Sequence, residues 1–122
     1  MGAIPTFGGV AIDCPDPGAL AGFYRSLLEW DEPKIAPDNH WATLVDPRGG
    51  VRLEFQRVAD YRAPEWPGQD QPQQAHLDLD VPDLEAAHQR VLGLGAKLLD
   101  DSPETFRVYA DPVGHPFCLC AC

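Results

Sequence analysis

Two short sequence patterns each occur twice in this chain, in the same order and at nearly the same separation. Residues 12–16 (IDCPD) match residues 79–83 (LDVPD), and the two segments lie 67 residues apart. Residues 46–49 (DPRG) match residues 111–114 (DPVG), 65 residues apart. A slip of two residues can be absorbed by one loop, so the patterns predict two copies of a single structural unit.

In each copy, the Pro-Asp pair follows a strand pattern and precedes a helix pattern. Apolar and polar side chains alternate over residues 76–81, as is typical of a half-buried strand. We expect Asp16 and Asp83 to cap the helices that follow, and Pro17 suits a first helical position. Apolar residues then recur at three- and four-residue steps, namely Leu20, Phe23, Tyr24, Leu27 and Leu28 in one copy and Leu84, Ala87, Val91 and Leu94 in the other.

After each helix the sequence predicts three more strands, the last two joined by an Asp-Pro-x-Gly turn. The expected strands are residues 32–35, 41–45 and 51–58 in the first copy and residues 96–99, 106–110 and 116–122 in the second. The fold class predicted is therefore α+β, with two tandem βαβββ modules in one 122-residue domain. Module one covers about 5–58 and module two about 73–122, and a Pro-rich linker occupies about 59–72.

Composition excludes several classes of protein. A formal net charge of −10 disfavours nucleic acid and anionic membrane surfaces as partners. No apolar run is long enough to span a bilayer, and the N-terminus lacks the pattern of a secretory signal, so we expect a cytoplasmic protein. Cys118, Cys120 and Cys122 alternate at the end of the chain and would share one strand face. In that compartment we expect free thiols rather than disulfides.

The repeated motifs, taken together, resemble the glyoxalase/bleomycin-resistance/dioxygenase family, also called the vicinal oxygen chelate superfamily. The resemblance is carried by residues 13–16 with the helix that follows, and by residues 46–54, 76–81 and 111–118. It covers nearly the whole chain. It implies paired βαβββ modules that curl into an open barrel-like cavity, a small-molecule ligand and a frequent homodimer. It says little about the reaction, because the fold hosts many chemistries.

The resemblance also implies where a metal ion would bind. Metal-dependent members place ligands on the first and last strand of each module, and the matching positions here are Gly9, Glu54, His76 and Cys118. Gly9 has no side chain, and Cys118 is a soft ligand that suits zinc or copper(I) better than iron(II) or manganese. Glu54 and His76 are thus the candidate catalytic residues and the candidate ligands of a divalent ion (Zn, Ni, Mn or Fe). Alternatively, they are polar cavity residues that bond each other or water.

Residues near Glu54 are candidates for ligand binding in the first copy. Arg52 and Gln56 flank Glu54 on the same predicted strand face. Arg52 would either clamp a carboxylate of the ligand or simply neutralise Glu54. Trp41 and Phe106 occupy matching positions in the two copies, and we expect them in the core or in the cavity wall.

In the second copy, Asp78 and Cys118 are the further ligand-binding candidates. Asp78 continues the strand face of His76, whereas Cys118 could also be an inert apolar filler. Tyr61 and Trp66 are large aromatics in the linker, where they would cover the cavity mouth or pack on a partner subunit. For His88 and His115 we expect solvent exposure.

Two functions remain open at this point. The first is a glyoxalase-like protein that binds a small molecule between its modules, as a lyase, an isomerase or a dioxygenase of unassigned reaction. The second is a non-catalytic module of the bleomycin-resistance type, which would sequester a cationic drug in an acidic groove. The charge of −10 and the missing ligand at Gly9 favour the second function.

Overall fold

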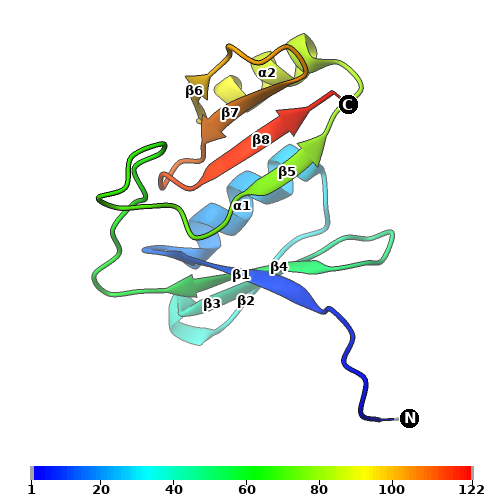
Figure 1. The fold of residues 1–122 in the computed structure, drawn as a ribbon. Coiled ribbons are helices and arrows are strands. Elements are labelled where there is room, and N and C mark those ends of the chain that lie inside the picture. Colours follow the sequence, from blue (N-terminus) through cyan, green and yellow to red (C-terminus); the bar gives the residue numbers. More distant parts are fainter. Residues whose placement is uncertain (1, 122) are drawn as a thin grey trace. The chain divides into compact units, whose positions relative to one another are not determined.

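The computed structural model describes residues 2–121, which divide after Tyr61 into two compact units. Figure 1 shows that each unit contains one sheet and one main helix. The first unit contains β1 (Gly9–Cys14), α1 (Pro17–Leu28), β2 (Lys34–Ile35), the short 3-10 helix η1 (Pro37–Asn39), β3 (Trp41–Val45) and β4 (Arg52–Arg57). The second contains β5 (Leu77–Asp80), α2 (Leu84–Gly93), β6 (Lys97–Asp100), β7 (Phe106–Ala110) and β8 (Pro116–Cys120). The predicted α+β fold of two βαβββ modules is confirmed.

The two sheets share one topology. Their strand orders are β1-β4-β3-β2 and β5-β8-β7-β6. In each sheet the first strand pairs in parallel with the last, and the other pairings are antiparallel. The repeat in the sequence is therefore a repeat in strand pairing, and the register places Ala11 beside Glu54 and Asp78 beside Cys118.

The strand limits differ from the predicted ones by a few residues. β4 begins at Arg52 rather than Val51, and β8 ends at Cys120, two residues before the predicted end. Cys122 lies outside the described residues. β5 begins at Leu77, because its ladder with β8 runs only from Leu77 to Asp80, and His76 immediately precedes it.

Each sheet packs its apolar face through stacked aromatic rings. In the first unit, Tyr24 of α1 stacks on Phe55 of β4 with ring centroids 5.9 Å apart. In the second, Tyr109 of β7 stacks on Phe117 of β8 at 5.5 Å. All four side chains are fully buried. Side chains alternate between the faces of a strand, so the neighbouring residues of β4, β7 and β8 point to the opposite face.

Local signals begin the helices and turn the strands as expected. Asp16 accepts a hydrogen bond from the backbone N of Ala19 at 3.2 Å, and Asp83 accepts one from Ala86 at 3.1 Å. In both Asp-Pro-x-Gly turns the glycine N donates to the aspartate carbonyl at 2.9 Å. Gly49 and Gly114 have φ angles of 87° and 99°, which side chains rarely allow.

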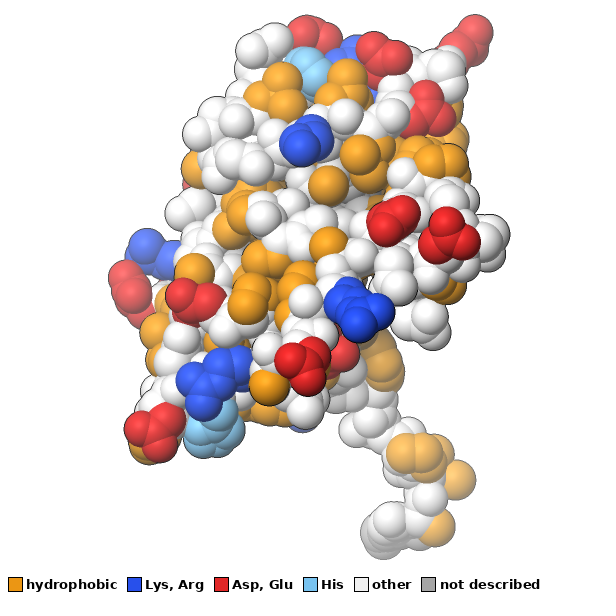
Figure 2. Space-filling view, turned by 90° about the vertical axis from the view of Figure 1, so that its left-hand side faces the viewer, with side chains coloured by type: hydrophobic (Ala, Val, Ile, Leu, Met, Phe, Trp, Pro, Cys, Tyr) orange, Lys and Arg blue, Asp and Glu red, His pale blue; other side chains and the backbone are white. Residues whose placement is uncertain are grey.

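The segment before β1 exposes apolar side chains. Figure 2 shows hydrophobic groups along this segment, where Ile4 is 84% and Phe7 is 72% exposed. Among residues 2–121, no helix has both the length and the apolar character needed to cross a bilayer.

Candidate functional site

A pocket of about 360 Å³ opens on the second unit, on the sheet face opposite Tyr109 and Phe117. The pocket takes alternate residues of β7 and β8, because alternate side chains share a face. The segment before β5 closes the rest of the wall. Among the described residues, the lining consists of Trp66, Gln73, His76, Asp78, Phe106, Val108, Pro116, Cys118 and Cys120.

Three potential metal-ligand side chains converge in this pocket. The Nε2 atom of His76 lies 3.1 Å from Oδ1 of Asp78. With Sγ of Cys118, these ligand atoms all lie within 4.8 Å of one another. The pairing of β5 with β8 explains the convergence, since Asp78 and Cys118 are register partners. The sequence placed these residues near a common face, and the structure brings them together.

The Cys118 thiol is held in its neutral form. Burial is the main cause, and the charge of Asp78 adds to it, so that the pKa of Cys118 rises from 9.0 to about 11. The thiolate is the reactive form of cysteine, so this residue is a poor nucleophile near neutral pH. Cys118 therefore serves as a buried wall of the pocket unless a metal ion displaces its proton.

Gln73, another residue of the pocket wall, has a buried side-chain oxygen without a hydrogen-bond partner in the described part of the chain. Among the described residues, its Oε1 atom is the buried side-chain oxygen that finds no hydrogen-bond partner. Buried polar atoms in proteins are nearly always hydrogen-bonded, so each exception calls for a reason. Gln73 is also one of the lining residues of the pocket.

The donor set of this cluster fits a zinc ion. Imidazole nitrogen, carboxylate oxygen and thiolate sulfur are the ligand atoms that zinc takes in proteins, and three protein ligands leave one position open. The sulfur atom of Cys118 argues against manganese or magnesium, which prefer oxygen ligands. Asp78 completes this set within the second unit, and Glu54, the other ligand predicted with His76, belongs to the first unit.

Glu54 is already engaged by its own unit. Its Oε2 atom accepts a hydrogen bond from Nε1 of Trp41 at 3.0 Å, and Oε1 accepts one from Nε of Arg52, also at 3.0 Å. This is the contact expected if Arg52 neutralises Glu54. Gln56 is exposed on β4, where it is the register partner of Trp41.

Gly9 has no room for a side chain. A Cβ atom built there would lie 2.5 Å from the carbonyl oxygen of Arg52 and 2.7 Å from its Cγ. Real Cβ atoms essentially never approach backbone so closely, so a residue with a metal-binding side chain would require β1 to shift. The packing of β1 on β4 therefore keeps this position free of a ligand.

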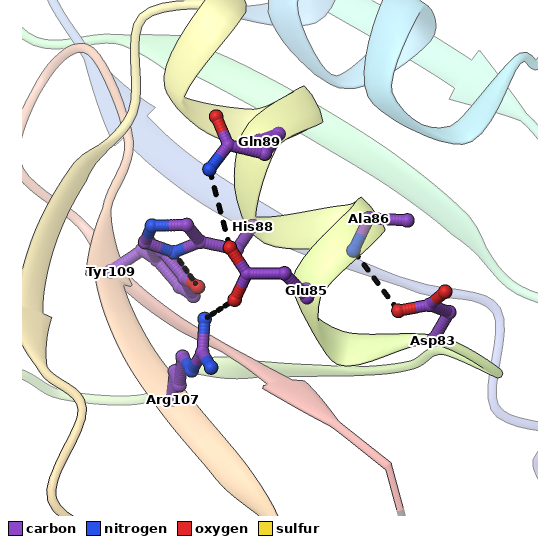
Figure 3. A network of polar contacts seen from close by, with 7 residues as sticks. All are labelled: Asp83, Glu85, Ala86, His88, Gln89, Arg107 and Tyr109. Carbon is purple, nitrogen blue, oxygen red and sulfur yellow. Dashed lines mark hydrogen bonds and ion pairs between the residues drawn. The ribbon is translucent and has the colours of Figure 1, made fainter.

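The prediction that His88 and His115 are solvent-exposed is wrong, because both are half-buried. Figure 3 shows the network that holds His88, in which its Nδ1 lies 2.8 Å from the hydroxyl of Tyr109. Tyr109 is fully buried, so its hydroxyl needs such a partner. Beside this pair, Arg107 contacts Glu85 at 3.1 Å.

Several pocket residues were not predicted from the sequence. Val108 and Cys120 could have been found, since they continue the alternation of Phe106 and Cys118 along β7 and β8. Gln73 could not, because it lies in a segment without periodicity. Trp66 was expected to cover the cavity mouth or to pack on a partner subunit; it is half-buried and lines this pocket.

Comparison with known proteins assigns the chain to a family. The sequence model of one protein family, the glyoxalase-like domain, matches residues 9–120. The chain belongs to the glyoxalase-like domain family. No significant match occurs among curated proteins.

Solved structures share the fold at low sequence identity. A glyoxalase/bleomycin resistance protein/dioxygenase family enzyme from Burkholderia phytofirmans PsJN is 16% identical, with a TM-score of 0.70 over 92% of this chain and 94% of that one. A glyoxalase family protein from Enterococcus faecalis is 22% identical, with a TM-score of 0.64 over 94% and 96%. The E126Q mutant of the fosfomycin resistance protein FosX from Listeria monocytogenes, complexed with Mn(II) and 1S,2S-dihydroxypropylphosphonic acid, is 11% identical. Its TM-score is 0.72 over 97% and 90%.

Proposed function

We propose that this protein binds a small molecule in the pocket of its second unit. The observation that carries the proposal is the composition of the pocket wall. Apolar side chains such as Trp66, Phe106 and Val108 form most of it, while His76 and Asp78 supply polar groups beside Cys118. A largely apolar hollow with a few convergent polar groups is the usual form of a ligand site.

The size of the pocket limits the ligand. A volume of about 360 Å³ lies near the lower end of the range for ligand sites, which is roughly 300–1,000 Å³. The ligand is thus small, with an apolar body that Phe106 and Trp66 can contact. The proposed binding surface lies within the second unit. A cavity shared by both modules remains a prediction from the family resemblance.

A fragment titration followed by two-dimensional amide NMR tests this function. We expect small aromatic fragments to shift the resonances of β7, β8 and residues 73–78. The variant Cys120→Phe should abolish these shifts, because Cys120 lines the pocket and the larger ring would fill it. Leu92→Phe is the matched control, since it adds a ring to the exposed side of α2. Binding that survives Cys120→Phe unchanged would rule the pocket out.

A metal-dependent enzyme is the second candidate, favoured by the convergence of His76, Asp78 and Cys118. A metal ion held there would polarise the oxygen atoms of a bound substrate. A fold neighbour, FosX from Listeria monocytogenes, carries Mn(II) in its structure. In this chain the Cys118 sulfur favours zinc. A lyase, isomerase or dioxygenase reaction would then depend on the bound zinc ion. A drug-sequestering role would need no reaction at all.

Metal analysis separates the two candidates. For the enzyme we expect close to one equivalent of zinc in protein purified without chelator, and a higher melting temperature on adding zinc than on adding manganese. Both effects should disappear in Cys118→Ser, while Cys14→Ser should retain them, because Cys14 lies in the first unit. Protein that gains neither metal nor stability from zinc would leave binding without a metal as the function.

A further inference from the structure

We propose that residues 62–75, which we call the strap, are a movable cover that controls entry to the pocket of the second unit. The strap is the green segment that leads to β5 in Figure 1, and it supplies Trp66 and Gln73 to the pocket wall. Its role in ligand entry rests on the proposed binding function, whereas its motion does not. Three features carry the inference: local hydrogen bonding, a close contact at Gly114 and the buried oxygen of Gln73.

The hydrogen bonds of the strap are local. The backbone N of Glu65 donates to the carbonyl oxygen of Gln71 at 2.6 Å, and the side chain of Gln69 donates to the carbonyl oxygen of Pro67 at 3.4 Å. Both bonds lie inside the strap, so they do not fix it to the sheet. Its prolines lack an N–H group and add no donors. A segment tied in this way opens at a lower free energy than the strands of the sheet.

The strap contacts the turn between β7 and β8. A Cβ atom built on Gly114 would lie 2.7 Å from the Cβ atom of Ala63, so the methyl group of Ala63 fills the space that this glycine leaves. The matching turn of the first unit has no such neighbour, because a Cβ atom built on Gly49 would meet nothing within 4 Å. The contact is therefore not a requirement of the turn, and it marks the point where the strap closes.

The buried oxygen of Gln73 favours opening. Among the described residues, its Oε1 atom is buried without a hydrogen-bond partner. A polar atom that has lost its water and gained no partner disfavours the state that buries it. When the strap lifts, this oxygen returns to water, whereas Trp66 loses its apolar contacts with the pocket. The two effects oppose each other, which keeps the open position within reach of thermal motion.

Alkylation of Cys118 measures the opening, because this thiol lines the pocket and is 7% exposed. The metal-free full chain is treated with iodoacetamide at pH 8, and tandem mass spectrometry gives the rate at Cys118. Gly114→Ala should raise this rate about tenfold or more, since an open state populated at about 0.1–10% leaves room for such a rise. Gly49→Ala is the matched control. It strains the same turn, with φ angles of 87° and 99° at the two glycines, but displaces no neighbour.

Two further variants separate the strap from general unfolding. Ala63→Gly, added to Gly114→Ala, should return the rate to that of Gly49→Ala, because it removes the displaced methyl group and keeps the strained turn. Gln73→Met should slow alkylation below the parent rate, because it removes the oxygen without a partner. Gln74→Met is its control, since Gln74 is exposed and outside the pocket wall. Loss of folding would produce neither the restored rate nor the slower one.

Fluorine NMR follows the strap directly. The full chain labelled with 5-fluorotryptophan gives one resonance for each of its three tryptophans, and Trp66→Phe assigns the one in the strap. Gly114→Ala should shift only the Trp66 resonance. Trp30 and Trp41 belong to the first unit, so their unchanged resonances would show that this unit remains folded.

The outcomes separate the strap from the binding function. Equal rates at Cys118 in Gly114→Ala and Gly49→Ala would overturn the strap, as would a raised rate that Ala63→Gly does not lower. The fragment titration judges the binding function by itself. Fragments that bind while these rates are equal defeat the strap alone. Fragments that fail to bind, while the variants follow the expected order, defeat the binding function and support the strap.

Discussion

Cys118 illustrates how a single side chain changes its chemistry with its surroundings. It is 7% exposed, and Asp78 is its register partner on the neighbouring strand. Burial and this negative neighbour raise the pKa of the thiol to about 11. The same residue at an exposed strand end would ionise at a lower pH, so the reactivity of this thiol is decided by packing.

This leads to a prediction about alkylation. In metal-free protein at pH 8, iodoacetamide should modify Cys120, which is half-buried, faster than Cys118. The rate at Cys118 should rise as the pH approaches 11, and Asp78→Asn should move that rise to lower pH, because it removes a charge that disfavours the thiolate. Peptide mass spectrometry measures both rates. Equal alkylation rates at Cys118 and Cys120 at pH 8 would contradict the raised pKa and the burial of Cys118.

The same shift has a consequence for stability. The folded-state pKa is raised above the value of 9.0, so the folded chain favours the protonated thiol. The resulting contribution to the free energy of unfolding is fully present below pH 9 and is lost as the pH rises through 11. Unfolding in urea at several pH values should show a smaller alkaline loss for Cys118→Ala than for the parent chain.

At the scale of elements, the two sheets have the same strand pairing, but corresponding faces of the two sheets carry different groups. In the first unit, the face away from α1 carries Glu54 held by Trp41 and Arg52. In the second unit, the matching face carries the pocket. Cys118 is the counterpart of Glu54 in the repeat, and its shorter side chain leaves space where the first unit places Glu54 and its partners.

The close pairing of β1 with β4 predicts a large effect at Gly9. Gly9→Ala should lower the free energy of unfolding by about 1–3 kcal/mol, because its Cβ would meet the Arg52 carbonyl oxygen at 2.5 Å. Gly8→Ala is the matched control. Its Cβ would meet only the end of the flexible Arg52 side chain, at 3.1 Å, so we expect a much smaller loss. Urea unfolding that ranks the two variants equally would contradict this packing.

The helix caps predict a second pair of effects. Asp16→Ala should destabilise the chain by about 1 kcal/mol, through loss of the hydrogen bond that Asp16 accepts at the start of α1. Asp83→Ala should cost less, because Asp16 also accepts a hydrogen bond from Asn39 at 2.6 Å. Urea unfolding of both variants gives the comparison, and a larger loss for Asp83→Ala would count against the role of Asn39.

The Asp16 cap should also respond to acid. The hydrogen bond from Asn39 is the main cause that lowers the pKa of Asp16, and the Ala19 backbone adds to it. A carboxyl with a lowered folded-state pKa stabilises the fold above its ordinary pKa of about 3.8, and this contribution is lost as the pH falls through the lower value. Asp16→Asn should therefore flatten the acid limb of the stability profile.

At the scale of the whole molecule, the family resemblance predicts a homodimer. The first unit exposes apolar side chains that would favour association, among them Phe7, Ile35 and Val45. Sedimentation equilibrium should give about twice the mass of the 13.4 kDa chain. A mass of one chain over a wide concentration range would contradict the prediction.

Most of the fold could be predicted from the sequence, because its signals are local. The caps at Asp16 and Asp83, the Asp-Pro turns and the alternation of β5 each act within a few residues. Two copies of these signals in one order indicated the repeat, and the repeat indicated the family. Part of the candidate site followed as well, since His76, Asp78 and Cys118 were placed on faces of neighbouring strands.

Tertiary structure decided which side chains meet. Gln73 and Trp66 reach the pocket from a segment without periodicity, and no local pattern can signal that. The burial of His88 depends on Tyr109, 21 residues away, and the clash at Gly9 depends on Arg52. Secondary structure follows from neighbours in the chain, whereas a site depends on distances between residues far apart in the chain, which only the packed fold determines.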